Sequence, residues 1–177
     1  MARLAALAAS LVLGVAAPAL ATDTVAPVRE VMQVTESNWS EVASAPEELF
    51  TADRLERLFS RSFRDLYARA MQDEFAREAG TPFDYDPIVD AQDGCPLENL
   101  TITPKPAEDG KAVVVARFQF QSCSGEGPES QAYSETWFEM VDEDGRAVID
   151  DIVVPYEAGG ANSTKAVLAD IAASQPN

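Results

Sequence analysis

The sequence predicts an α+β fold: N-terminal helices packed on a curved antiparallel sheet, followed by a short C-terminal helix. Residues 51–80 repeat apolar side chains at spacings of three and four, as one face of an amphipathic helix does. Residues 100–154 contain short runs of β-branched and aromatic residues separated by turn sequences. The two kinds of segment do not alternate, as the crossovers of a parallel sheet would require.

The first residues, MARLAALAASLVLGVAAPALA, have the pattern of a secretory signal peptide. Arg3 precedes an apolar run over 4–17, and Ala19 and Ala21 stand where a signal peptidase reads small residues. The run is shorter than the roughly 18–20 residues that cross a bilayer, so we favour cleavage after Ala21 over an anchor. We therefore expect residues 22–177 to form one domain that is periplasmic or secreted, with no membrane insertion after cleavage.

Two helices are predicted in the first half of that domain. Residues 27–39 form the first, with Pro27 in its first turn and Trp39 among its buried side chains. Residues 51–80 form a single long helix, capped by Thr51 and ended by Gly80. Its predicted apolar face consists of Leu55, Leu58, Phe59, Ser62, Leu66, Tyr67, Ala70, Met71 and Phe75.

The second half is predicted to be mainly strands. Strands are expected over 100–103, 112–121, 132–141 and 147–154, with a turn over 104–110 and a hairpin connection over 142–145. The glycine-rich stretch that follows leads to a closing helix over 164–173, with Ser163 as its cap.

The charge of the chain limits its partners. It has 30 acidic and 13 basic residues and a formal net charge of −17. Such a charge repels phosphate backbones and anionic lipid, so we expect no nucleic-acid partner. A solvated acidic surface explains the charge more simply than a charge-driven function does, although cationic partners and divalent ions are permitted.

Two cysteines, Cys95 and Cys123, are present in a chain predicted to reach an oxidising compartment. A disulfide between them is the expected state, and it would stabilise the fold by about 3–4 kcal/mol in the chain-entropy model. A reactive thiol would need a basic neighbour, and neither cysteine has one close in the sequence.

Several segments together resemble an exported bacterial family, domain of unknown function 3828. They are the signal peptide, the amphipathic helix, FDYDPIVDAQD, the strand VIDDIVV and the terminal STKAVLADI. The resemblance covers about residues 45–173, although the tryptophan expected just before the last strand is absent. That family is similar to the nuclear transport factor 2-like fold, so the resemblance implies a sheet curved around helices into a cone with a pocket. It implies no activity.

The segment 83–95, FDYDPIVDAQDGC, carries Asp84, Asp86, Asp90 and Asp93. Carboxylate oxygens suit Ca²⁺, but this spacing lacks the glycine and the closing glutamate of a twelve-residue calcium loop. We favour a turn in which Asp86 caps a short helical segment beginning at Pro87. The metal site is kept as the weaker alternative.

Gln92 and Asp93 follow in the same segment. The resemblance places them where the chain enters the sheet, whose final strand contains residues 149–152. We expect their side chains to bond to the backbone of that strand. With Asp86, they are the predicted junction between helices and sheet.

No catalytic constellation can be assembled from the sequence. The chain has no histidine, which removes the commonest general base and zinc ligand, and it has no phosphate loop or nucleophile elbow. An isomerase-like enzyme in a cone pocket would need an Asp as base and a Tyr as oxyanion donor. Candidates for lining this pocket are Tyr67, Trp137, Asp150 and Asp151, with Tyr133 and Tyr156 as further donors. We favour ordinary packing for the aromatic residues.

The sequence therefore favours an exported, non-enzymatic binding or interaction module that needs no cofactor. Its ligand or protein partner is unknown, and an inhibitor- or immunity-like role is one version. The alternative is an isomerase- or hydrolase-like enzyme that uses an Asp/Tyr pair in the pocket.

Overall fold

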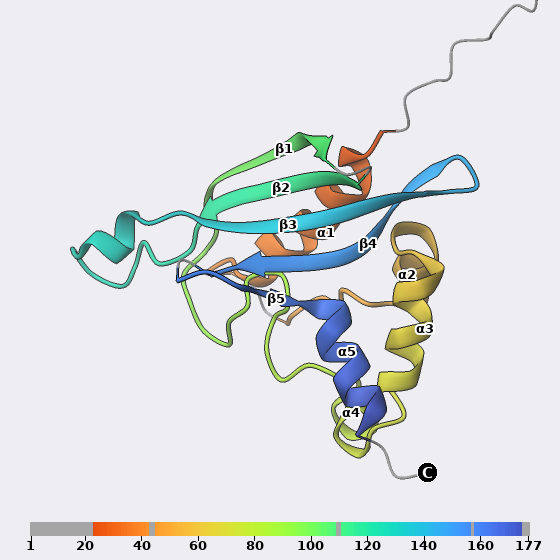
Figure 1. The fold of residues 1–177 in the computed structure, drawn as a ribbon. Helices are drawn as coiled ribbons and strands as arrows, with labels where there is room; N and C mark the ends of the chain where they lie inside the picture. The colour runs from red at the N-terminus through yellow and green to blue at the C-terminus, as the bar shows by residue number, and fades with distance from the viewer. Residues whose placement is uncertain (1–22, 43–44, 109–110, 157, 175–177) are drawn as a thin grey trace, which may run out of the picture.

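The helices come first and an antiparallel sheet with a closing helix follows, which confirms the α+β class (Figure 1). The computed structural model describes residues 23–42, 45–108, 111–156 and 158–174, so the predicted signal peptide lies outside the described residues. The helices are α1 (Val25–Asn38), α2 (Ala52–Leu58), α3 (Arg61–Ala70), α4 (Glu74–Ala79) and α5 (Thr164–Ala173). The strands are β1 (Glu98–Glu108), β2 (Lys111–Gln119), β3 (Ser134–Glu143), β4 (Arg146–Pro155) and β5 (Ala161–Ser163). A short 3₁₀ helix, η1 (Pro128–Gln131), precedes β3.

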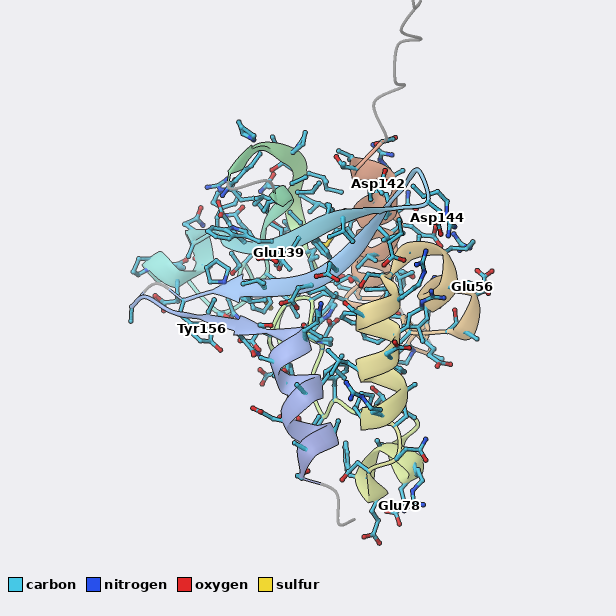
Figure 2. The ribbon with its side chains drawn as sticks, turned by 45° about the vertical axis from the view of Figure 1, so that its right-hand side comes forward. Glu56, Glu78, Glu139, Asp142, Asp144 and Tyr156 are labelled. Carbon is cyan, nitrogen blue, oxygen red and sulfur yellow. A yellow bond between two sulfur atoms is a disulfide. The ribbon has the colours of Figure 1, made fainter. Side chains whose placement is uncertain are left out.

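The strands form one antiparallel meander in the order β1-β2-β3-β4-β5. The hairpin predicted over 142–145 joins β3 to β4. Asp144 and Gly145 have φ values of 56° and 78°, and a two-residue turn of type I′ requires positive φ at both positions. Figure 2 shows Asp142 and Asp144 at the far end of this hairpin.

One face of the sheet packs against the helices. Figure 1 shows α1 behind the sheet and α3 beside α5 next to β4. Side chains alternate along a strand, so every second residue of β2 and β3 points toward the helices. The buried residues of this core include Val28, Val31, Met32, Val114, Phe118, Phe138, Ile149, Ile152 and Leu168. The cone expected from the family resemblance stays a prediction.

The single helix predicted over residues 51–80 is wrong, because the chain forms α2, α3 and α4 there. Thr51, Ser60 and Asp73 each accept a backbone N–H from the first turn of the helix that follows. Such caps satisfy donors that a new helix leaves unpaired, so they favour a fresh start over continuation. Ser60 is also extended, and its N–H donates to the carbonyl of Ile149 at 2.8 Å. Gly80 ends α4 with a φ of 76°, as predicted.

Because the chain forms three helices, part of the predicted apolar face is exposed to solvent. Tyr67 and Ala70 are buried as expected, but Ser62 is exposed. Phe75 is 48% exposed, because α4 is a separate helix that no longer follows the stripe of α3.

The edges of the sheet also differ from the sequence prediction. The turn predicted over 104–110 is largely strand, since β1 continues to Glu108. Pro104 and Pro106 are tolerated because β1 is an edge strand, where a missing N–H need not break an inner ladder. The sequence prediction missed β5, a three-residue strand that follows a glycine-rich stretch and pairs with β4.

The disulfide between Cys95 and Cys123 is present, with 5.7 Å between the Cα atoms. Cys95 is buried, and its N–H donates to the carbonyl of Phe120 at 2.8 Å. The disulfide therefore fastens the segment that enters the sheet to the loop after β2.

Candidate functional site

A pocket of about 650 Å³ lies where the end of α1 meets two loops, residues 46–50 and 79–87. Its volume falls within the range of roughly 300–1,000 Å³ typical of small-molecule sites. The aromatic residues that line it are Trp39, Phe50, Tyr67, Phe83 and Tyr85. Three stretches that are distant in sequence thus form one cavity, and aromatic side chains from each of them contribute to its lining.

The first loop is held across the end of α1 by a pair of hydrogen bonds. The Asn38 amide donates to the carbonyl of Glu47 at 2.9 Å, and the Glu47 N–H donates back to Asn38 Oδ1 at 2.6 Å. Arg54 of α2 pairs with the Glu47 carboxylate and donates to the carbonyl of Glu48 at 2.8 Å. This wall of the pocket is therefore bonded to both α1 and α2.

Phe50 connects the pocket to the core. Its ring centroid lies 5.2 Å from that of Tyr67, 5.6 Å from Phe83 and 5.5 Å from Phe59. Aromatic pairs at such distances contribute about 0.5–1.5 kcal/mol each beyond their buried area. The pocket wall is thus continuous with an aromatic cluster of the core.

Asp86 also lines the pocket and joins the second loop to the end of α1. Its Oδ2 accepts the indole N–H of Trp39 at 2.8 Å, and its Oδ1 accepts the N–H of Ile88 at 2.8 Å. Burial raises the pKa of the Asp86 carboxyl, and hydrogen bonds from Trp39 and from the backbone of Ile88 and Val89 act against the rise. The predicted capping role takes the form of a turn, in which the Asp90 N–H donates to the carbonyl of Asp86 at 2.9 Å.

Trp39 also packs tightly on its other side. Its ring meets Phe120 edge-on, with 6.2 Å between the centroids. A Cβ added at Gly94 would lie 2.7 Å from the Phe120 ring and 3.0 Å from the Trp39 ring. Glycine at position 94 therefore allows the chain to pass these rings just before Cys95.

Tyr67 is the one sequence-predicted pocket residue that lines this cavity. Burial raises the pKa of its hydroxyl to about 12, and the nearby charge of Glu48 adds to the rise. A hydrogen bond with the Thr81 side chain acts in the opposite direction. Tyr67 therefore remains a neutral phenol at physiological pH.

Asp150 and Asp151 lie outside the pocket and join β4 to two helices. Asp150 accepts hydrogen bonds from Ser60 at 2.6 Å and Ser62 at 2.8 Å, and Lys165 of α5 pairs with it at 2.9 Å. Asp151 accepts the Lys165 N–H at 3.0 Å at the start of α5. The junction between helices and sheet is therefore made here, by residues that the sequence assigned to a pocket.

The cluster at Asp150 places a serine next to a lysine, a combination that serves as a nucleophile and base in some hydrolases. Here Lys165 Nζ lies 2.7 Å from Ser62 Oγ. Burial alone would raise the pKa of Asp150, but hydrogen bonds from Ser60, Lys165 and Ser62 and the Lys165 charge lower it overall. The same carboxylate accepts from Ser62 and pairs with Lys165, so the arrangement suits a charged structural tie.

Trp137 faces away from the helices on the outer side of the sheet. Its indole N–H donates to Glu135 at 2.9 Å, and Lys105 Nζ lies 4.1 Å from its ring centroid. Tyr133 and Tyr156 border a second, smaller hollow of about 430 Å³ and are both partly exposed. The structure therefore separates Tyr67, Trp137 and the two aspartates instead of gathering them in one pocket.

The Asp-rich segment is likewise dispersed. Asp90 accepts from the Asn162 amide at 2.7 Å, while Asp84 O accepts from the Gln92 amide at 3.0 Å. Gln92 and Asp93 are exposed, and neither bonds to β4 within the described part of the chain, which corrects the expected junction. Across the described residues, no group of three or more His, Cys, Asp or Glu side chains is placed to hold a metal ion.

Comparisons with protein-family models, with curated proteins and with solved structures find no match to this chain. Among the helices described, none has the length and apolar character needed to cross a membrane. Apart from its aromatic residues, nothing in the sequence indicates the position of the pocket, because its walls come from segments that are distant in the chain.

Proposed function

We propose that this protein is an exported binding protein that holds a small organic ligand in the pocket between α1 and residues 79–87. The observation that carries the proposal is a cavity of about 650 Å³ lined by five aromatic residues. Cavities of this size and character are the usual form of small-molecule sites. The aromatic walls supply apolar area, and Glu48, Asp86 and Gln92 supply polar atoms at the edge.

The polar groups that line the pocket are already engaged by the protein, as expected for groups that shape a binding site. Both Asp86 oxygens already accept hydrogen bonds from the protein, and Asn38 is occupied by Glu47. Tyr67 keeps its proton because burial raises its pKa to about 12. These hydrogen bonds hold Asp86 and Asn38 in fixed positions, so the two side chains shape and orient the walls of the pocket.

A second candidate is the isomerase- or hydrolase-like enzyme with an Asp/Tyr pair. One observation favours it: Asp86 and Tyr67 line the same pocket, and burial raises the pKa of both. The pair would therefore be Asp86 and Tyr67, in place of Asp150 or Asp151. A general base with a raised pKa suits this chemistry.

Two observations support export of the protein: the disulfide and the signal-peptide pattern of the first residues. The bond between Cys95 and Cys123 is compatible with an oxidising compartment outside the cytoplasm. Membership of the domain of unknown function 3828 family and a nuclear transport factor 2-like cone remain predictions. An inhibitor- or immunity-like role with a basic protein partner remains a prediction from charge.

The binding proposal can be tested by replacing each of two alanine residues with phenylalanine. Ala79 lines the pocket and is exposed, whereas Ala68 is exposed on α3 and does not line it. We expect Ala79→Phe to fill part of the cavity and Ala68→Phe to leave it open. The purified proteins would be incubated with a small-molecule extract of periplasm and examined by native mass spectrometry.

The expected result is an added mass on the wild type and on Ala68→Phe that is absent from Ala79→Phe. An added mass retained equally by Ala79→Phe, or no added mass on the wild type, would overturn the proposal. Turnover of the captured compound, abolished in Asp86→Asn, would instead favour the enzyme.

A further inference from the structure

The charged residues that line the pocket all have the same sign. They are Glu47, Glu48 and Asp86, and neither lysine nor arginine belongs to the described lining. Arg54 pairs with Glu47 and so offsets one of the three. The charge that remains at the pocket is negative.

Asp86 is the most informative of these carboxylates. It is partly buried, and its hydrogen-bond donors are all neutral: the Trp39 indole and the backbone N–H groups of Ile88 and Val89. No basic side chain pairs with it among the described residues. Buried charges in proteins are usually paired with an opposite charge, because desolvating an unpaired ion is costly. The pocket thus contains a carboxylate without a counter-ion.

Glu48, which lines the pocket from the loop 46–50, adds a second negative charge. Its charge is felt at Tyr67, whose pKa it helps to raise. Its backbone carbonyl is held by Arg54, but its carboxylate has no ion-pair partner in the described part of the chain. Two acidic residues from different loops thus line a cavity that contains five aromatic residues.

We infer that the ligand of this pocket is an organic cation with an apolar body, such as a quaternary ammonium compound. The inference rests on the proposed binding function. The ammonium group would supply the counter-ion for Asp86 and Glu48. The apolar part would lie against the aromatic residues, whose ring faces attract cations. Anionic ligands are disfavoured by these carboxylates and by the net charge of −17.

Three probes of similar shape distinguish the effect of ligand charge on binding from the effect of ligand shape. Choline carries a positive charge, dimethylbutanol is its neutral carbon isostere, and dimethylbutanoate is the corresponding anion. The readout is the indole N–H signal in two-dimensional NMR of the full exported chain. Trp39 borders the pocket, while Trp137 on the outer face of the sheet serves as an internal control.

We expect choline to move the Trp39 signal and leave the Trp137 signal in place. It should bind about tenfold more tightly than dimethylbutanol, and dimethylbutanoate should bind most weakly. Added salt should weaken choline binding and leave dimethylbutanol unchanged, because only the former is electrostatic.

The matched variants are Glu48→Gln, Asp86→Asn and Glu56→Gln. Each removes one negative charge, but Glu56 is exposed on α2 and does not line the pocket (Figure 2). We expect the first two to weaken choline binding several-fold and the third to leave it unchanged. Glu48→Gln is the variant least able to disturb folding, because the Glu48 side chain is exposed.

Equal affinity for choline and dimethylbutanol would overturn the cation inference and leave the binding proposal standing. An unmoved Trp39 signal with choline would also overturn the inference. The binding proposal is decided separately by the extract experiment with Ala79→Phe, so the two failures are distinguishable.

Discussion

The indole N–H of Trp39 donates to the carboxylate of Asp86 across 2.8 Å, although the two residues are 47 positions apart in the chain. This bond joins the end of α1 to the Asp-rich segment and closes one side of the pocket. It also gives a partly buried carboxylate one of its neutral donors. The structure around Asp86 therefore links the stability of the fold to the shape of the pocket.

Replacing Trp39 by Phe should destabilise the protein by about 1–3 kcal/mol, since Asp86 would lose a partly buried donor and the smaller Phe ring would keep only part of the packing. Urea unfolding at neutral pH measures the change. Trp137→Phe is the matched control, because its partner Glu135 lies on the outer face of the sheet. Equal losses of unfolding free energy in the two variants would show that the bond to Asp86 stabilises the protein no more than the bond of Trp137 to Glu135 does.

Asp86→Asn should change how stability depends on pH. The pKa of Asp86 is raised in the folded state above its ordinary value of 3.8, so the native protein binds a proton more readily than the unfolded chain. The stabilisation from this group is fully present below the unfolded pKa and is lost as pH rises through the folded pKa. The wild type should therefore gain stability relative to Asp86→Asn as pH is lowered from 7 to about 4. Denaturant titrations across this range measure the difference, and parallel curves would contradict the assignment.

Ser60→Ala should cost more stability than Ser62→Ala. Both hydroxyls donate to Asp150, but Ser60 is fully buried and also caps α3 by accepting the Phe63 N–H. Loss of a cap costs about 1 kcal/mol, and loss of a buried hydrogen bond adds a similar amount. Chemical denaturation compares the two variants. A larger loss for Ser62→Ala would contradict the capping argument.

The double change Cys95→Ala and Cys123→Ala should lower the free energy of unfolding by roughly 3–4 kcal/mol, because the unfolded chain gains the freedom of an open loop. The sequence separation between the two cysteines is 28. Thermal unfolding of the double variant and of wild type with and without reductant measures this. Wild type with reductant should approach the double variant, whose melting temperature should not respond to reductant.

The sequence was most reliable where a local signal decides the structure. Ser163 caps α5 by accepting the Ala166 N–H, and Gly80 ends α4, both as their residue types predict. The hairpin at Asp144-Gly145 follows from two residues that tolerate positive φ. Such features need only neighbours in the chain.

The predicted long helix shows where that reasoning fails. The apolar stripe over 51–80 continues through Ser60 and Asp73, so periodicity alone gives one helix. Serine and aspartate inside a helical pattern can also cap a new helix. At Ser60 the backbone N–H donates to the carbonyl of Ile149 on β4, and this bond favours ending α2 and starting α3 there. The deciding partner lies 89 positions away, beyond any local pattern.

The α+β class, the antiparallel hairpins, the closing helix and the pairing of the only two cysteines could be predicted from the amino-acid sequence, because they follow from periodicity, turn chemistry and composition. In contrast, it is the folded arrangement of distant segments that brings Asp86 and Tyr67 to one pocket, while Asp150 and Asp151 join β4 to α3 and α5. An aspartate has the same local preferences in either place. Its role is set by the donors that folding brings to it, and those come from distant parts of the chain.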